Sequence, residues 1–161
     1  MDEKELSKII LEYIESHNAL SLATESDGLP HAASVFYVNT GFNLYFLSNP
    51  RSRHGINLSR NPRVSATINE DYSRWRMIKG IQLEGNVHIL GGIWEKGRIG
   101  LSFIKKYPDV SDFFSLPIKL GEEIFRKVED VKFYELIPSR IYFINNELGF
   151  GHREELNLTV T

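Results

Sequence analysis

Apolar positions recur along the chain at two different spacings, which separate helices from strands. Residues 3–17 place apolar side chains at the spacing of one helical face, namely Leu6, Ile9, Ile10, Tyr13 and Ile14. This pattern predicts an amphipathic helix that packs one side on a core. Apolar and polar residues alternate over 19–24, 31–38, 44–48 and 64–68, as half-buried strands do. Turn residues at 26–28 and 39–41 predict hairpins between the first three strands.

The clearest alternation covers residues 81–89, where Gly85 interrupts the pattern and predicts a bulge or a close backbone approach. A helix is expected over 93–106, ended by Pro108, and two short strands over 132–137 and 140–144 around Pro138-Ser139. Residues 109–131 give no readable pattern. Strands at hairpin spacing without long helices between them favour an antiparallel sheet curled into a barrel, mainly β with flanking helices, in a single domain over 1–161.

A candidate anion site lies between the strands at 44–48 and 64–68. Ser52 can cap a short helix that Asn61-Pro62 ends, and Arg53 and His54 then fall in its first turn. Free backbone N–H groups, a guanidinium and the hydroxyls of Ser48 and Ser52 suit a phosphomonoester. An ordinary solvated turn with scattered arginines is the alternative. No Asp or Glu occurs between Asp27 and Glu70, so local carboxylates do not oppose these arginines, although acids elsewhere in the fold can reach them.

Composition narrows the function classes. The 161 residues are 42% hydrophobic and 25% charged, typical of a globular protein, and the net charge of −2 argues against general affinity for nucleic acid or anionic membranes. Cysteine is absent, which excludes disulfides and thiolate chemistry. The five histidines lack metal-site spacing, so no metal is expected. The charged N-terminus and the lack of a long apolar run predict a cytoplasmic protein without a membrane segment.

The central motif resembles a known family. In residue types and in order, three segments resemble the pyridoxamine 5'-phosphate oxidase-like FMN-binding split barrels. They are Tyr45-Phe46-Leu47-Ser48, Ser52-Arg53-His54 and Asn61-Pro62-Arg63-Val64-Ser65. Lys79-Gly80-Ile81-Gln82-Leu83-Glu84-Gly85 resembles the family's next strand. The ending, residues 143–151, is similar to a small uncharacterised bacterial branch of the family. The resemblance covers about residues 9 to 155.

This resemblance implies a split antiparallel β-barrel of Greek-key type and a homodimer that binds FMN at the subunit interface. Ser48 and Arg53 match positions that bind the FMN phosphate, with Ser52 and His54 beside them, and His54 replaces a lysine. Leu47 and the strand residues Ala33, Ser34 and Val35 match positions against the flavin ring. Gly80 stands where the family often has glutamine, and Gln82 is the best substitute for a flavin hydrogen bond. An aromatic from the partner subunit is expected near the ring, and the options are Trp75, Trp94 and Phe150.

The resemblance does not identify catalytic residues. Vitamin B6 oxidases hold the substrate phosphate with a Tyr and an Arg where this chain has Phe103 and Tyr107, so a true pyridoxamine phosphate oxidase is not expected. His152-Arg153 is either a distant echo of the family's basic C-terminal motif or an exposed polar tail. The sequence therefore favours an FMN-dependent oxidoreductase acting on a small molecule. The rival is a non-catalytic module that holds a flavin, haem or other ligand in a degenerate flavin site.

Overall fold

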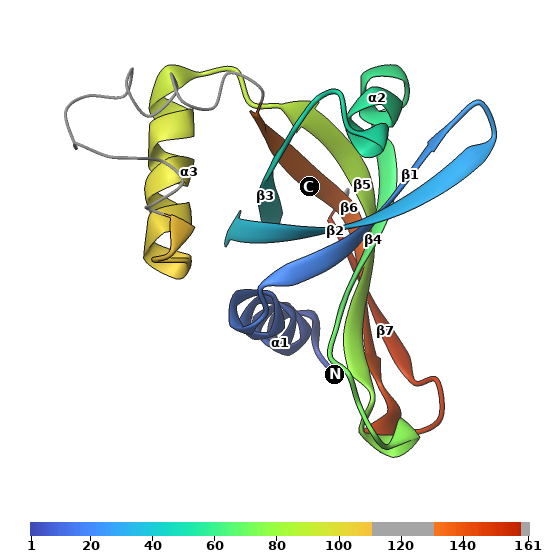
Figure 1. Ribbon diagram of the computed structural model, residues 1–161. Helices are drawn as coiled ribbons and strands as arrows, with labels where there is room; N and C mark the ends of the chain where they lie inside the picture. Colours follow the sequence, from blue (N-terminus) through green and yellow to red (C-terminus); the bar gives the residue numbers. More distant parts are fainter. Residues whose placement is uncertain (111–130, 159–161) are drawn as a thin grey trace.

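The computed structural model describes residues 1–110 and 131–158 (Figure 1). Its elements follow one another as α1 (Glu3–Ser16), β1 (Ala19–Ser26), β2 (Leu29–Thr40), β3 (Asn43–Ser48), α2 (Arg53–Arg60), β4 (Arg63–Asn69), η1 (Trp75–Met77), β5 (Lys79–Ile89), α3 (Ile93–Lys106), β6 (Lys132–Asn145), η2 (Asn146–Leu148) and β7 (Arg153–Asn157). The stretch 109–131, which shows no readable pattern of apolar positions, lies largely outside the described residues. No helix in the described ranges is long and apolar enough to cross a membrane.

A six-stranded antiparallel barrel forms the centre of the molecule. The strands pair in the order β3-β2-β1-β4-β5-β6, and pairing between β3 and β6 closes the ring. Each of the hairpins predicted among the first three strands is present. The barrel class expected from the sequence is therefore confirmed, with α1, α2 and α3 around it (Figure 1).

Strand alternation fills the barrel with apolar side chains. On β1, Leu20 and Leu22 point inward and are buried, while Ser21 and Ala23 face outward. The predicted N-terminal helix is confirmed as α1, where the Asp2 carboxylate accepts a hydrogen bond from the Glu5 N–H at 2.8 Å and caps the first turn. Its buried residues join the barrel core.

A second core lies outside the barrel wall, beneath α3. Ile99 and Phe103 of α3 pack with Val38 of β2, Tyr45 of β3 and Phe133 of β6. The strand β3 is consequently covered on both faces, one by the barrel interior and the other by α3. This explains why Tyr45 is as buried as its inward-facing neighbours.

The prediction of two short strands around Pro138-Ser139 is wrong, because β6 runs unbroken from Lys132 to Asn145. Pro138 lies opposite Gly85, where the register between β5 and β6 shifts. A bulge interrupts the ladder of hydrogen bonds, so proline's missing N–H is tolerated there. A Cβ on Gly85 would overlap the Ile137 carbonyl oxygen, which confirms the close approach expected at this glycine.

The C-terminal segment is a strand and not a polar tail. Residues Arg153–Asn157 form β7, which pairs antiparallel with β6 outside the closed ring. Leu156 is the buried residue of this strand and joins the barrel core. The side chain of Arg153 is consequently held over the outer face of the sheet, beside β5 and β6.

Candidate functional site

The end of β3 and the start of α2 bring together the four residues predicted to bind phosphate. The Ser52 hydroxyl accepts a hydrogen bond from the Gly55 N–H at 3.1 Å, so the predicted helix cap is confirmed. Ser48 Oγ lies 3.5 Å from Ser52 Oγ and also hydrogen-bonds His54 Nε2. We call Ser48, Ser52, Arg53 and His54 the cradle. Backbone N–H groups in a first helical turn have no partner within their helix and are available to an anion.

A glycine sets the shape of the cradle. A Cβ on Gly55 would lie 2.6 Å from the Pro50 carbonyl oxygen and 2.7 Å from that of Asn49. The first turn of α2 therefore packs directly on the backbone of the preceding turn. Any residue other than glycine at position 55 would require the backbone to shift. This contact fixes the helix start against the end of β3.

His54 has a neighbour that the sequence analysis did not assign to the site. The imidazole of His31, from β2, lies parallel to that of His54, with ring centroids 6.3 Å apart and planes 9° apart. Burial, and then the charge of His31, lower the pKa of His54 below its ordinary value. His54 is therefore neutral near pH 7. The signal in the sequence was the alternation of β2, which places His31 on the same face as Ala33 and Val35.

The arginines of this region differ in their contacts. Arg60, at the other end of α2, pairs with Asp27 at 2.9 Å, so an acid from the β1–β2 turn does reach it. Arg51 also has an interaction partner. Arg53 is exposed, and its guanidinium makes no hydrogen bond or ion pair with the rest of residues 1–110 and 131–158. It is therefore the arginine of the cradle that can meet an anion without first breaking a contact.

The predicted ring-contact residues do not share one face. Of the three on β2, Val35 is buried in the barrel core, Ala33 is half-buried on the same side, and Ser34 is exposed on the outer surface. Leu47 packs on the second core beneath α3. Within one chain, Ala33 lies on the side of the sheet toward which His31 points, and Ser34 lies on the opposite side.

Gln82 belongs to the outer face of the sheet. Strand pairing aligns Ser34, Ser21, Thr67 and Gln82 in one outward row across four strands. The Gln82 side-chain oxygen accepts a hydrogen bond from Arg153 at 3.3 Å. No hydrogen bond or ring contact among the described residues joins Gln82 to the cradle, so the single chain does not bring these predicted contacts together.

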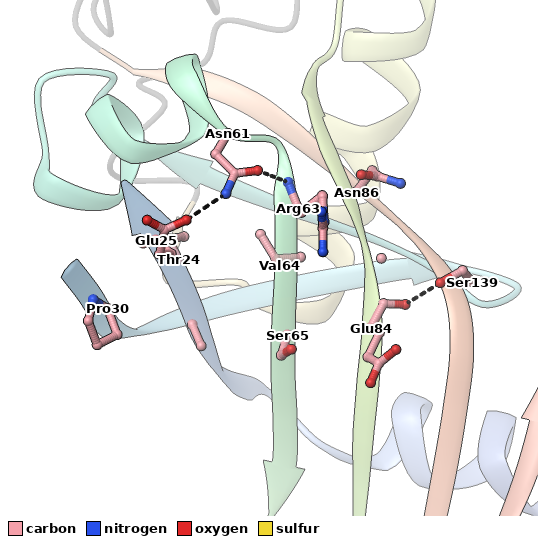
Figure 2. A pocket seen from close by; sticks show the side chains of 12 residues that line it. Thr24, Glu25, Pro30, Asn61, Arg63, Val64, Ser65, Glu84, Asn86 and Ser139 are labelled. Atoms are coloured by element: carbon pink, nitrogen blue, oxygen red, sulfur yellow. Dashed lines mark hydrogen bonds between the residues drawn. The ribbon is translucent and has the colours of Figure 1, made fainter. Parts of the chain in front are cut away.

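Two hollows of about 640 Å³ each lie on this outer face. The first crosses β1, β4 and β5, and Figure 2 shows Arg63 and Ser65 in it between Glu25 and Glu84. Asn61 closes one side by donating to the Glu25 carboxylate at 2.9 Å. The second hollow contains Gln82 and Arg153. Neither is lined by a residue of the cradle.

The three aromatics considered for a partner-subunit contact are all exposed in the single chain. Trp94 is 90% exposed, Phe150 87% and Trp75 52%. Trp75 and Phe150 meet edge to face, with ring centroids 5.7 Å apart, because Asn146 ties η2 to the Trp75 carbonyl oxygen at 2.8 Å. Core packing therefore does not account for any of the three.

Comparisons with known proteins agree with this architecture. The family model described as Pyridoxamine 5'-phosphate oxidase matches residues 6–144. A UPF0306 protein of Klebsiella pneumoniae is 25% identical over 143 residues, which cover 88% of this chain and 86% of that protein. Among solved structures, Campylobacter jejuni ChuZ superposes with a TM-score of 0.76 at 20% identity, over 98% of this chain and 61% of ChuZ. HutZ of Vibrio cholerae, described as a heme storage protein, superposes with a TM-score of 0.64 at 20% identity, over 81% of this chain and 88% of HutZ.

Proposed function

The chain belongs to the pyridoxamine 5'-phosphate oxidase family, and from that premise we propose that it binds FMN and acts as an oxidoreductase on a small molecule. The observation that carries the proposal is the cradle, where Ser48 meets the first turn of α2. Two hydroxyls, the free N–H groups of a helix start and an unengaged guanidinium fit a phosphate monoester. The chemistry that FMN supplies is hydride or electron transfer at its ring.

In this proposal the chain's own residues hold and orient the cofactor. Arg53 provides the charge and Ser52 provides a hydroxyl donor. The hydrogen bond between Ser48 and neutral His54 leaves that pair one donor for the phosphate, which is either the Ser48 hydroxyl or the second imidazole N–H. His54 carries less positive charge than the lysine usual at this position, so phosphate affinity depends more heavily on Arg53. Gln82 is proposed to meet the ring, and an aromatic of the partner subunit is proposed to cover it in a homodimer.

The substrate is proposed to differ from pyridoxamine phosphate. Phe103 is buried within the second core, and Tyr107 donates its hydroxyl hydrogen to backbone oxygens of Asn18 and Tyr37. Neither is a cation, and Tyr107 is engaged in holding α3 to the barrel. They offer no phosphate clamp of the kind the vitamin B6 oxidases carry.

A second candidate is a protein that holds a flavin or a haem without catalysis. It is favoured by the likeness to HutZ, described as a heme storage protein, and by the adjacent imidazoles of His31 and His54, since imidazole is a common haem ligand. Titration of the purified protein with FMN and with haem separates the two ligands. Catalysis is tested separately, because only an enzyme's bound flavin is reduced by a nicotinamide nucleotide, or reoxidised by an acceptor, at a catalytic rate. Light scattering tests the proposed dimer.

A further inference from the structure

Arg153 is an arginine held in place by neutral groups. Its guanidinium lies over the ring of Tyr142, 4.9 Å from the centroid, and donates to the Gln82 side-chain oxygen at 3.3 Å. The aromatic contact and the amide orient the side chain without neutralising it. An arginine fixed in this way keeps donors available for a ligand.

The carboxylates around Arg153 are engaged by other groups. Glu154 meets the N-terminal ammonium at 3.5 Å and His152 at 3.2 Å, and Glu155 lies 3.8 Å from Arg140. Glu147 pairs with Lys79 at 2.7 Å. Within residues 1–110 and 131–158, Arg153 itself has no ion pair.

The second hollow opens beside this guanidinium. Its wall includes the hydroxyls of Thr67 and Tyr72 and the amide of Gln82, all capable of donating hydrogen bonds. Gly80 forms part of the wall, and a Cβ there would lie 3.1 Å from the Ile68 carbonyl oxygen. The backbone of β4 therefore packs closely against Gly80, and a side chain at this position would be crowded.

Charges in the hollow favour a monoanion. Glu70 accepts a hydrogen bond from His17 at 3.0 Å, and Lys79 pairs with Glu147. Arg153 is therefore the cation of the lining that has no ion pair within residues 1–110 and 131–158, and the carboxylates of Glu70 and Asp71 are the opposing charges. One guanidinium beside neutral donors suits a carboxylate, because it can donate two parallel hydrogen bonds to the two carboxylate oxygens. A phosphate dianion would be repelled more strongly by Asp71.

We propose that this hollow binds the carboxylate of a small organic acid, and that this acid is the class of substrate on which the protein acts. The second part rests on the proposed function, since Gln82 is the residue proposed to meet the flavin ring. Arg153 would thus hold the acid next to the cofactor from the same subunit that supplies Gln82.

Benzoate is a suitable probe, with benzamide as its uncharged counterpart and inorganic phosphate as the competing anion. Binding is followed through the backbone amide resonances of Gly80 and Gly151, which both line the hollow. We expect benzoate to shift both resonances in a saturable way, with benzamide and phosphate much weaker. Arg153→Gln should weaken benzoate binding about tenfold or more, because a charge-assisted hydrogen bond is lost.

Arg140→Gln is the matched control, since it removes the same charge from the neighbouring strand at a residue that already pairs with Glu155. It should leave benzoate binding unchanged, whereas Asp71→Asn should strengthen it. Failure of benzoate to bind wild type, equal binding of benzamide, or equal loss in both arginine variants would overturn the anion site. FMN titration of the same proteins separates the two hypotheses: Arg153→Gln should keep its FMN affinity, and a protein that binds benzoate but no FMN would refute only the cofactor.

Discussion

Arg53 carries the largest single share of the proposed phosphate affinity, and its replacement is the most informative perturbation of the cradle. The side chain is exposed and makes no described contact, so Arg53→Ala removes nothing that stabilises the fold. A hydrogen bond to a charged group contributes about 1.5–3 kcal/mol. This loss corresponds to FMN affinity weaker by roughly 10- to 150-fold.

The assay is a titration of apoprotein with FMN, followed by quenching of flavin fluorescence, with the melting temperature as a check on folding. Arg60→Ala is the matched control because it removes the same charge from the other end of α2, where the guanidinium is paired with Asp27. We expect Arg60→Ala to bind FMN nearly as wild type does. Wild-type affinity in a folded Arg53→Ala protein, or equal losses in the two variants, would refute the assignment of the phosphate to the cradle.

His54→Lys should tighten FMN binding several-fold, because an ammonium is charged at neutral pH; weaker binding in the titration would contradict this. Since burial and the charge of His31 lower the pKa of His54 and a bound phosphate raises it, wild-type affinity should increase as the pH falls toward the ordinary titration range of histidine. A His54→Gln protein should lack this increase. Gly85→Ala should cost about 1–3 kcal/mol in urea unfolding. Gly97→Ala, in open space on α3, should instead stabilise by about 0.5–1 kcal/mol.

The sequence predicted correctly those helices and strands whose start, end or alternation depends only on neighbouring residues. The helix cap at Ser52 and the alternation on β1 and β5 follow from neighbouring residues alone, and the structure confirms them. The close backbone approach at Gly85, where the register with β6 shifts, was also signalled by a glycine inside a regular alternation. Together these fix the barrel class, because strands at hairpin spacing have few other ways to pair.

The errors came from long-range pairing. Pro138 signals a break in any single strand, and β6 continues through it because the register with β5 shifts there, with Ser139 as the extra residue on β6. The sequence of β7 is mostly polar because this strand lies outside the closed barrel and is largely exposed to solvent. Its single buried residue, Leu156, anchors it to the core. Without β7 the position of Arg153 beside Gln82 could not be foreseen.

The residues of the candidate site that are close in sequence were predicted, whereas those that strand pairing brings to it were not. Ser48, Ser52, Arg53 and His54 are close in sequence, and they lie together. His31 joins them through strand pairing, and its contact with His54 depends on how α2 packs over β1 and β2. Gln82 lies on the outer face of the sheet, so whether it meets the same ligand depends on the proposed second subunit.

Cofactor identity is the most direct test of the central claim. The purified protein would be measured by visible absorption before and after adding FMN, and the small molecules released on denaturation would be identified by mass. The predicted result is a two-band flavin spectrum from the folded protein, with one FMN bound per chain and FMN identified among the molecules released on denaturation. A protein that neither carries nor takes up FMN, or that takes up only haem, would contradict the proposal.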